Sequence, residues 1–294
     1  MWEKEVVLPA NQAPVTLKEQ LLLWHVPRRL RGRLRQQRRV LLNGHYQPTS
    51  TNLQPGDVIT MHFEQADFAP ESAYVPDDRV VLPVLFETAD FLVINKPKGM
   101  KSHPNSPGED GTVMNFVEAY LQPQGQHAYM VHRLDGETTG AMLVGKKPYI
   151  VPILNELLRE KEIKRTYLAW VTGALTSNAG TIDLPIGEDP VHNRLRQVNG
   201  PNARLALTHW QKIHQVYQNT LVRIELETGR THQIRVHFAA IGHPLIGDAL
   251  YNPQATPDIG LMLHAASIRV PMPFEGTVRS ISAPLPRSFP RNLT

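Results

Sequence analysis

Short runs of β-forming residues, broken by turn residues, dominate the chain from Val84 onward. Helical patterns are fewer and do not alternate regularly with these runs, which disfavours a doubly wound parallel fold. We expect an α+β fold with a mixed, largely antiparallel sheet. The predicted strands are Val84–Glu87, Phe91–Asn95, Ala141–Val144, Arg165–Val171, Val222–Glu227 and Ile268–Val270. The predicted helices are Val113–Leu121, Ile150–Lys161 and Thr231–Ile241.

The net charge of the 294 residues is +4, and all of the excess lies near the N-terminus. Residues 1–65 contain nine Lys and Arg against five Asp and Glu, whereas the remainder contains 22 of each. This asymmetry is typical of a polyanion-binding module attached to a neutral body. There is no cysteine, which excludes disulfides, thiolate chemistry and Cys-ligated zinc.

No apolar run approaches the roughly 18 residues of a membrane span. The first residues carry charges where a signal peptide needs an apolar core. We therefore expect a cytoplasmic protein without a membrane partner.

Residues 28–39 contain seven arginines in twelve positions. Pro27 suits the first turn of a helix, on which Leu30 and Leu34 would share one face. Strand and turn signals follow, at Val40–Leu42 and Val58–Met61, so a folded module is favoured over a disordered arm. The arginines expected to contact RNA are Arg28, Arg31, Arg35, Arg38 and Arg39.

Leu17, Leu21, Leu22 and Trp24 predict a second short helix upstream. Together these signals give a small α/β module that resembles the S-four RNA-binding domain. The resemblance rests on the Val-x-x-Asn-Gly and Gly-Asp-x-Ile patterns, while the segment from Thr16 departs from the family's usual Arg-Leu-Asp. We expect this module over residues 1–65, a linker over 66–82 and a catalytic domain over 83–294.

Asp135 lies in the run Val-His-Arg-Leu-Asp-Gly-Glu-Thr-Thr-Gly, which ends at Gly140. Glycines on both sides of Glu137 allow a tight loop, so this run is typical of a reactive carboxylate held on a turn. An ordinary surface turn would give the same short pattern, and the decision depends on other segments.

Four further segments carry polar residues beside strands. Phe91–Met100 includes Lys96 and Lys98 next to a rigid turn, and Lys164–Gly173 presents Tyr167. Leu226–His237 joins a strand to a helix start, where backbone N–H groups favour anions. The fourth is the Gly- and Pro-rich loop Gly242–Asp248.

In order and spacing, these segments resemble the RluA family of pseudouridine synthases from about Phe91 to Pro271. Gly136 and Thr139 depart from the residues usual in that family. The resemblance implies isomerisation of uridine in RNA to pseudouridine, without metal or other cofactor. Ribosomal RNA is the expected substrate and transfer RNA the second choice, with the protein acting as a monomer.

By this resemblance Asp135 is the nucleophile and Tyr167 stacks on the uracil. Burial raises the pKa of a carboxyl group and a nearby cation lowers it, so an ionised nucleophile needs a cationic partner. The resemblance gives Arg230 that role.

A uridine in structured RNA must be flipped out of its stack before it can react. His132 and Arg133 flank Asp135 and are predicted to fill the vacated space or hold flanking phosphates. The other predicted RNA contacts near the site are Lys96, Lys98, Thr231, His232 and Arg235.

Several motifs do not carry a function. Gly140–Lys147 superficially matches a phosphate-binding loop but lacks its Ser or Thr, and is predicted to be a buried strand. His232 and His237 lie five residues apart and miss the spacing of a helical zinc pair.

Two other classes of function are considered. A non-catalytic RNA-binding or assembly factor would be expected to lack Asp135, Tyr167 or Arg230, and all three are present. A glycosidase needs paired carboxylates, for which only Glu137 lies near.

Overall fold

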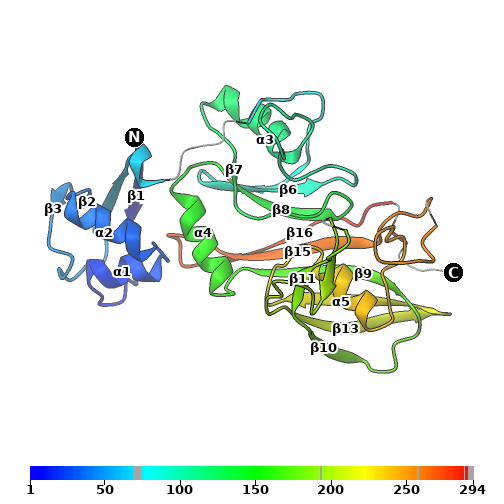
Figure 1. Cartoon of the computed structure of the whole chain (residues 1–294). Coiled ribbons are helices and arrows are strands. Elements are labelled where there is room, and N and C mark those ends of the chain that lie inside the picture. The colour runs from blue at the N-terminus through cyan, green and yellow to red at the C-terminus, as the bar shows by residue number, and fades with distance from the viewer. Residues whose placement is uncertain (69–73, 193, 257, 288, 291–294) are drawn as a thin grey trace.

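The structure is a computed structural model that describes residues 1–68, 74–192, 194–256, 258–287 and 289–290. It consists of a small N-terminal body and a larger body built on a long, twisted sheet (Figure 1). None of the helices in these ranges is long and apolar enough to cross a bilayer.

The small body, which we call the N-terminal module, is a four-stranded antiparallel sheet with order β1-β4-β2-β3 and two short helices. Its elements are β1 (Trp2–Val7), α1 (Leu17–Leu23), α2 (Arg28–Gln36), β2 (Val40–Leu42), β3 (His45–Tyr46), β4 (Val58–Phe63) and the 3-10 turn η1 (Gln65–Asp67).

Local sequence explains where these helices lie. Helix α1 begins after Thr16, whose side chain and that of Glu19 form a reciprocal capping box. Pro27 directly precedes α2. Leu30 and Leu34 are buried on one side of α2, which confirms the predicted apolar face.

The larger body contains a ten-stranded mixed sheet whose main path runs β10-β13-β14-β9-β15-β8-β6-β5. The strands on this path are β5 (Val84–Glu87), β6 (Phe91–Lys96), β8 (Thr139–Gly145), β9 (Lys164–Thr172), β10 (Ala179–Asp183), β13 (Leu207–Val216), β14 (Asn219–Leu226) and β15 (Leu263–Pro271). The other elements are β7 (Tyr129–Met130) and β16 (Val278–Ser282) at its sides, the hairpin β11 (Ile186–Glu188) with β12 (Arg196–Val198), the helices α3 (Val113–Leu121), α4 (Ile150–Arg159) and α5 (Gln233–Ala240), and the 3-10 turn η2 (Gln122–Gln124).

All six strands and three helices predicted from Val84 onward are present, with shifted ends in most cases. The pairings within the large sheet are antiparallel except between β15 and β8, so the predicted α+β class is confirmed. The strands β1, β3, β7, β10–β13 and β16 were not predicted.

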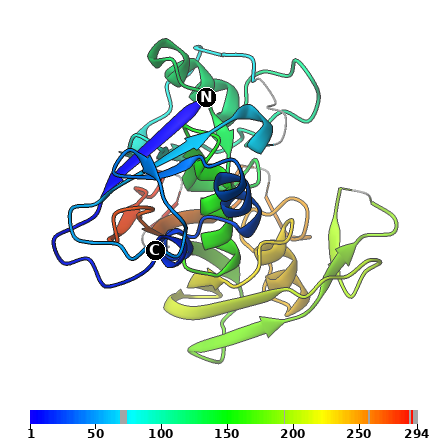
Figure 2. The ribbon, with the colours of Figure 1, turned by 90° about the vertical axis from the view of Figure 1, so that its left-hand side faces the viewer.

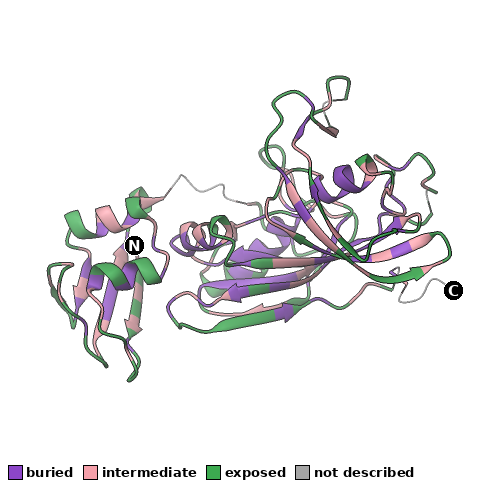
Figure 3. Ribbon diagram, turned by 90° about the horizontal axis from the view of Figure 1, so that it is seen from below, coloured by how far each residue is buried: buried purple, intermediate pink, exposed green. Residues whose placement is uncertain are grey.

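The central strands are buried on both faces (Figure 3). Phe91 and Val93 of β6 belong to a core shared with α4, whereas Leu92 and Ile94 belong to a second core with α3. Every residue of β8 is buried, which confirms that the segment resembling a phosphate-binding loop is a core strand.

Gly140 is required where β8 runs parallel to β15. Its φ is +110°, and an added Cβ would lie 2.2 Å from the carbonyl oxygen of Ala265. Because only glycine tolerates this approach, the residue fixes how the loop before β8 leaves the sheet.

The N-terminal module packs against α4 and the end of β15, and Figure 2 views the molecule from the module's side. The rings of Phe63 and Tyr149 stack with centroids 4.8 Å apart, and Trp24 meets Phe274 edge-on at 5.4 Å. Lys4 Nζ lies 2.6 Å from Asp90 Oδ2. The two bodies therefore share an apolar, partly charged interface.

Residues 66–82, which were expected to form a linker, contact one of the two bodies at each end. Asp67 pairs with Arg39 in the N-terminal module, while Asp77 and Leu82 are buried against the larger body. Residues 69–73 lie outside the described residues. The exact domain boundaries stay a prediction.

Candidate active site

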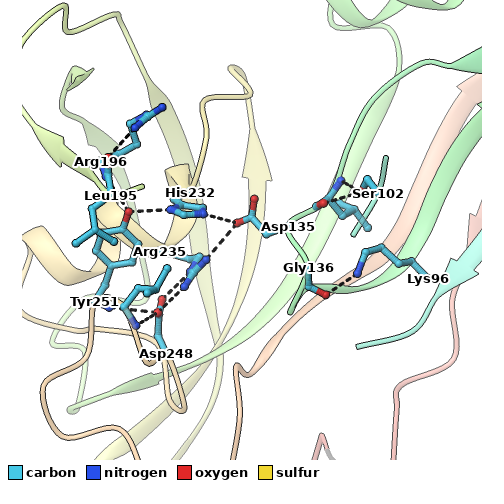
Figure 4. A network of polar contacts seen from close by, with 12 residues as sticks. Lys96, Ser102, Asp135, Gly136, Leu195, Arg196, His232, Arg235, Asp248 and Tyr251 are labelled. Atoms are coloured by element: carbon cyan, nitrogen blue, oxygen red, sulfur yellow. Dashed lines mark hydrogen bonds and ion pairs between the residues drawn. The ribbon is translucent and has the colours of Figure 1, made fainter. Parts of the chain in front are cut away.

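Asp135 lies on the loop between β7 and β8, and this loop is held on both sides (Figure 4). Ser102 Oγ donates to the carbonyl of Leu134 at 2.6 Å and accepts from the Leu134 N–H at 3.0 Å. On the other side, Lys96 Nζ donates to the carbonyls of Gly136 and Thr138 at 2.7 and 2.9 Å. The carboxylate is thus carried by a fixed backbone.

Lys96 was expected to contact RNA, and that expectation is wrong. Its side chain is completely buried, and its Nζ also donates to the carbonyl of Pro97. Burial lowers the pKa of Lys96 to about 8, against the raising effect of Glu137 and Asp135. Lys96 is a positioning residue for the loop.

The cation beside Asp135 is Arg235, whose Nη1 lies 3.5 Å from Asp135 Oδ2. Arg230, the predicted partner, instead donates from Nε to the carbonyl of Leu205. The reason is local: His232 has a left-handed φ of 58°, so α5 begins only at Gln233 and turns Arg235 toward the loop. Arg230 still lines the same cavity.

Arg235 is held in place by a second carboxylate. Its Nε and Nη2 donate to the two oxygens of Asp248 at 2.8 and 2.7 Å, and Asp248 is fully buried. A bidentate pair of this kind fixes the guanidinium plane. Arg235 was predicted to contact RNA, but its buried position commits it to the two carboxylates.

His232 also points toward Asp135, with 3.9 Å between Nε2 and Oδ2. Its Nδ1 lies 2.8 Å from the hydroxyl of Tyr251, which in turn accepts the backbone N–H of Arg196. Burial lowers the pKa of His232, with Asp135 acting in the opposite direction. His232 is thus part of the network around the carboxylate and lines the same cavity, and its contact with RNA stays a prediction.

Tyr167 lines the same cavity of about 250 Å³ as Asp135 and Arg235. The residue is 5% exposed, and burial raises the pKa of its hydroxyl. Much of the remaining wall is apolar, formed by Leu134, Leu226, Ile234 and Leu263. The cavity thus combines an ionisable carboxylate with an aromatic and apolar wall suited to a flat base.

Comparison with known proteins identifies the family of this site. Residues 90–240 match the family described as RNA pseudouridylate synthase, and residues 4–59 match the RluD ribosomal pseudouridine synthase N-terminal domain. The chain belongs to the RNA pseudouridylate synthase family. It is accordingly an RNA pseudouridine synthase, an isomerase.

Two curated relatives illustrate the match. The uncharacterized RNA pseudouridine synthase YhcT of Bacillus subtilis is 37% identical over 79% of this chain and 76% of its own length. Ribosomal large subunit pseudouridine synthase D of Escherichia coli O6:H1 is 35% identical, with 85% and 80% covered.

Among solved structures, human RNA pseudouridylate synthase domain containing 1 has a TM-score of 0.60 at 27% identity. It covers 70% of this chain and 84% of its own. Human RNA pseudouridylate synthase domain containing 4, at 24% identity and a TM-score of 0.59, covers 70% and 90% and has the same fold.

Of the two residues flanking Asp135 on its N-terminal side, only one is exposed. Arg133 lines the cavity, with Nη1 3.3 Å from His103 Nε2. His132 is buried, its Nε2 accepts the N–H of Leu143, and burial lowers its pKa to about 3. His132 is therefore neutral, and its predicted contact with flanking phosphates stays a prediction.

Lys98 and Thr231 stay predictions as RNA contacts. Lys98 is partly exposed, 4.0 Å from Glu137, and Thr231 lines the cavity.

In the N-terminal module the arginines differ in their availability. Arg28, Arg35 and Arg38 are exposed, and their contact with RNA stays a prediction. Arg39 instead pairs with Asp67 at 2.6 and 2.8 Å, which commits it to the fold. Arg31 donates to the carbonyl of Val26 at the base of α2 and is half-buried.

His237 has a structural role, with Nδ1 beside Thr208 and Nε2 beside the carbonyl of Leu184. Within the described ranges, no group of three or more possible metal ligands was found.

Sequence reasoning missed Ser102, Asp248 and Tyr251. Only Asp248 had a signal, because it ends the glycine-rich loop Gly242–Asp248. Gly247 there has a φ of +71°, and an added Cβ would meet the carbonyl oxygen of Gly260.

Proposed function

We propose that this enzyme isomerises uridines of ribosomal RNA and that Asp135 is its nucleophile. The observation that carries the proposal is one cavity in which Asp135 lies beside a buried cation, Arg235, and near an aromatic wall, Tyr167. The ribosomal substrate is supported by the names of the relatives that match both parts of the chain.

In the proposed reaction the Asp135 carboxylate attacks either the uracil ring or the anomeric carbon of the ribose. Covalent capture divides a difficult step into two easier ones. The N-glycosidic bond breaks, the uracil turns while it is held, and its C5 forms the new carbon–carbon bond. The bond to Asp135 breaks as the product forms, the hydrogen on C5 leaves as a proton, and N1 takes up a proton, so atoms and charge are conserved.

Tyr167 would stack on the uracil while it turns. Because burial raises the pKa of its hydroxyl, the residue stays neutral at physiological pH and can donate or relay a proton. Arg133, at the mouth of the cavity, would occupy the space that the flipped uridine leaves. Unchanged RNA affinity and turnover in Arg133→Ala would contradict that role.

The test of the central proposal is tritium release from RNA labelled at C5 of uridine. Asp135→Asn should abolish release, because the amide cannot act as the nucleophile. Glu137→Gln is the matched control: it lies two residues away, is exposed, and should keep most of the wild-type rate. Equal release by wild type and Asp135→Asn would overturn the assignment.

We further propose that the N-terminal module supplies RNA affinity. Each lost phosphate contact should reduce the slope of log affinity against log salt by about 0.7 on single strands. Deleting residues 1–65 should flatten this slope while Asp135 chemistry persists at high RNA concentration. An unchanged slope would contradict the module's role.

We also propose that the enzyme acts in the cytoplasm, where its ribosomal substrate would be met, and as a monomer. Mapping pseudouridine in ribosomal and transfer RNA from cells lacking the protein would test the substrate.

A further inference from the structure

Arg165 is an arginine of the active-site cavity that the proposed reaction does not use. It precedes Tyr167 by two residues on β9, and because side chains alternate along a strand, the two point to the same face. Both line the cavity that contains Asp135. Arg165 is half-buried, and its Nη atoms would be 3.6 Å from a Cβ added to Gly229, another residue of the cavity wall.

Arg165 has no partner within the described part of the chain. Its Nε is buried without a hydrogen-bond acceptor, and no ion pair involves its guanidinium. The other arginines of the cavity differ: Arg133 meets His103, Arg230 meets Leu205, and Arg235 meets Asp248. A half-buried cation without an acceptor lowers the free energy of unfolding. We therefore expect a ligand to supply the missing acceptor.

A second donor in the same cavity is also unsatisfied. His132 accepts a hydrogen bond at Nε2, so its proton lies on Nδ1, and that buried atom makes no hydrogen bond of standard geometry, with only the backbone of Arg133 nearby. The charge of Arg165 lies close enough to lower the pKa of His132. Two neighbouring donors without acceptors favour a ligand with several oxygens.

The charge of the site favours a phosphate over the uracil itself. Uracil is neutral, and the apolar and aromatic wall is suited to its faces. A phosphate next to the Asp135 carboxylate would be repelled unless a cation lies between them. Guanidinium groups bind phosphate through paired hydrogen bonds.

We infer that Arg165, together with the Nδ1–H of His132, binds a phosphate of the flipped uridine nucleotide. This inference rests on the proposed function, in which such a nucleotide enters the cavity. Arg165 is then a specificity residue that selects a nucleotide in a chain over free uridine.

Binding of uridine, uridine 5′-monophosphate and uridine 3′-monophosphate, measured by calorimetry at low salt, tests the inference. The wild-type protein should bind one monophosphate about 10-fold more tightly than uridine, as expected for a charge-assisted contact. Arg165→Met should lose this preference and keep its affinity for uridine, and Arg165→Lys should keep part of the preference. Arg269→Met removes an exposed arginine of β15 outside the cavity and should behave as wild type.

Three results would overturn the inference. One is a wild-type protein without preference for either monophosphate. Another is an equal loss of uridine and monophosphate affinity in Arg165→Met, which would show that Arg165 holds the base. The third is a lower urea midpoint for Arg165→Met than for Arg269→Met, which would show a structural role. These measurements need no turnover, so they are independent of whether wild type releases tritium.

Discussion

Arg235 contacts two carboxylates at once, and this arrangement determines its contribution to stability and to the proposed reaction. Asp248 fixes the guanidinium through two hydrogen bonds, and the remaining Nη1 faces Asp135. The cation is therefore preorganised before any RNA arrives. A preorganised charge does not have to rearrange during the reaction. Such preorganisation is the usual source of electrostatic rate enhancement.

Replacing Arg235 by Met should cost both stability and rate. The buried Asp248 would lose its partner, at about 3–5 kcal/mol of unfolding free energy. Single-turnover tritium release should fall about 100-fold, by analogy with loss of one preorganised polar group. Urea denaturation and rapid-quench kinetics measure the two effects.

Arg230→Met is the matched control for this prediction. Its guanidinium donates to one carbonyl and pairs with no carboxylate among the described residues, so both effects should be small. A larger rate loss for Arg230→Met than for Arg235→Met would restore Arg230 as the partner of Asp135.

Lys96 gives the loop a pH-dependent stability. Its pKa is about 8 in the folded protein, against 10.5 as the ordinary value, so between these limits the unfolded chain binds more protons. The contribution of Lys96 to stability therefore rises with pH through this window, by about 3 kcal/mol in total. The unfolding free energy of wild type minus that of Lys96→Met should be larger at pH 10 than at pH 7. A constant difference would contradict the assigned pKa.

At the scale of elements, we expect the arginines on and just after helix α2 to divide between RNA contact and folding. Arg35 is exposed, whereas Arg39, just after the helix, is paired with Asp67. Arg35→Met should reduce the salt slope of RNA binding by about 0.7 and leave stability unchanged. Arg39→Met should instead lower the urea midpoint and leave the salt slope of RNA binding nearly unchanged. Equal slopes for both variants would show that α2 does not contact phosphates.

Elements with a strong internal pattern were predictable from the sequence, and those stabilised by distant partners were not. Val113–Leu121 and Val84–Glu87 match the structure residue for residue. Strand β1 is half exposed and is completed only by pairing with β4, more than 50 positions away. The hairpin of β11 and β12 is short, and its strands pair across an irregular loop.

The candidate site divides in the same way. The family resemblance named Asp135 and Tyr167 as site residues, and the structure places both in the wall of one cavity. It could not distinguish Arg230 from Arg235, because the choice depends on the left-handed backbone at His232. Burial is likewise a property of the fold, so the sequence did not show that Lys96, at the end of β6, and His132, in the loop before β8, are buried.

At the scale of the whole molecule, the interface between the two bodies resembles a core. Phe63 and Tyr149 stack across it. A double-mutant cycle with Phe63→Ala and Tyr149→Ala should give a coupling of about 0.5–1.5 kcal/mol in unfolding free energy. Additive effects of the two substitutions would mean that the N-terminal module is not docked in solution.

Strand β6 connects this interface to the catalytic loop. Just before it, Asp90 accepts from Lys4 of the N-terminal module, and at its last residue Lys96 holds the backbone around Asp135. Six residues of extended strand span about 20 Å. In the proposed roles of these parts, β6 sets a fixed distance between the RNA-binding module and Asp135. The enzyme would then select a uridine by its distance from the bound RNA segment as well as by its own structure.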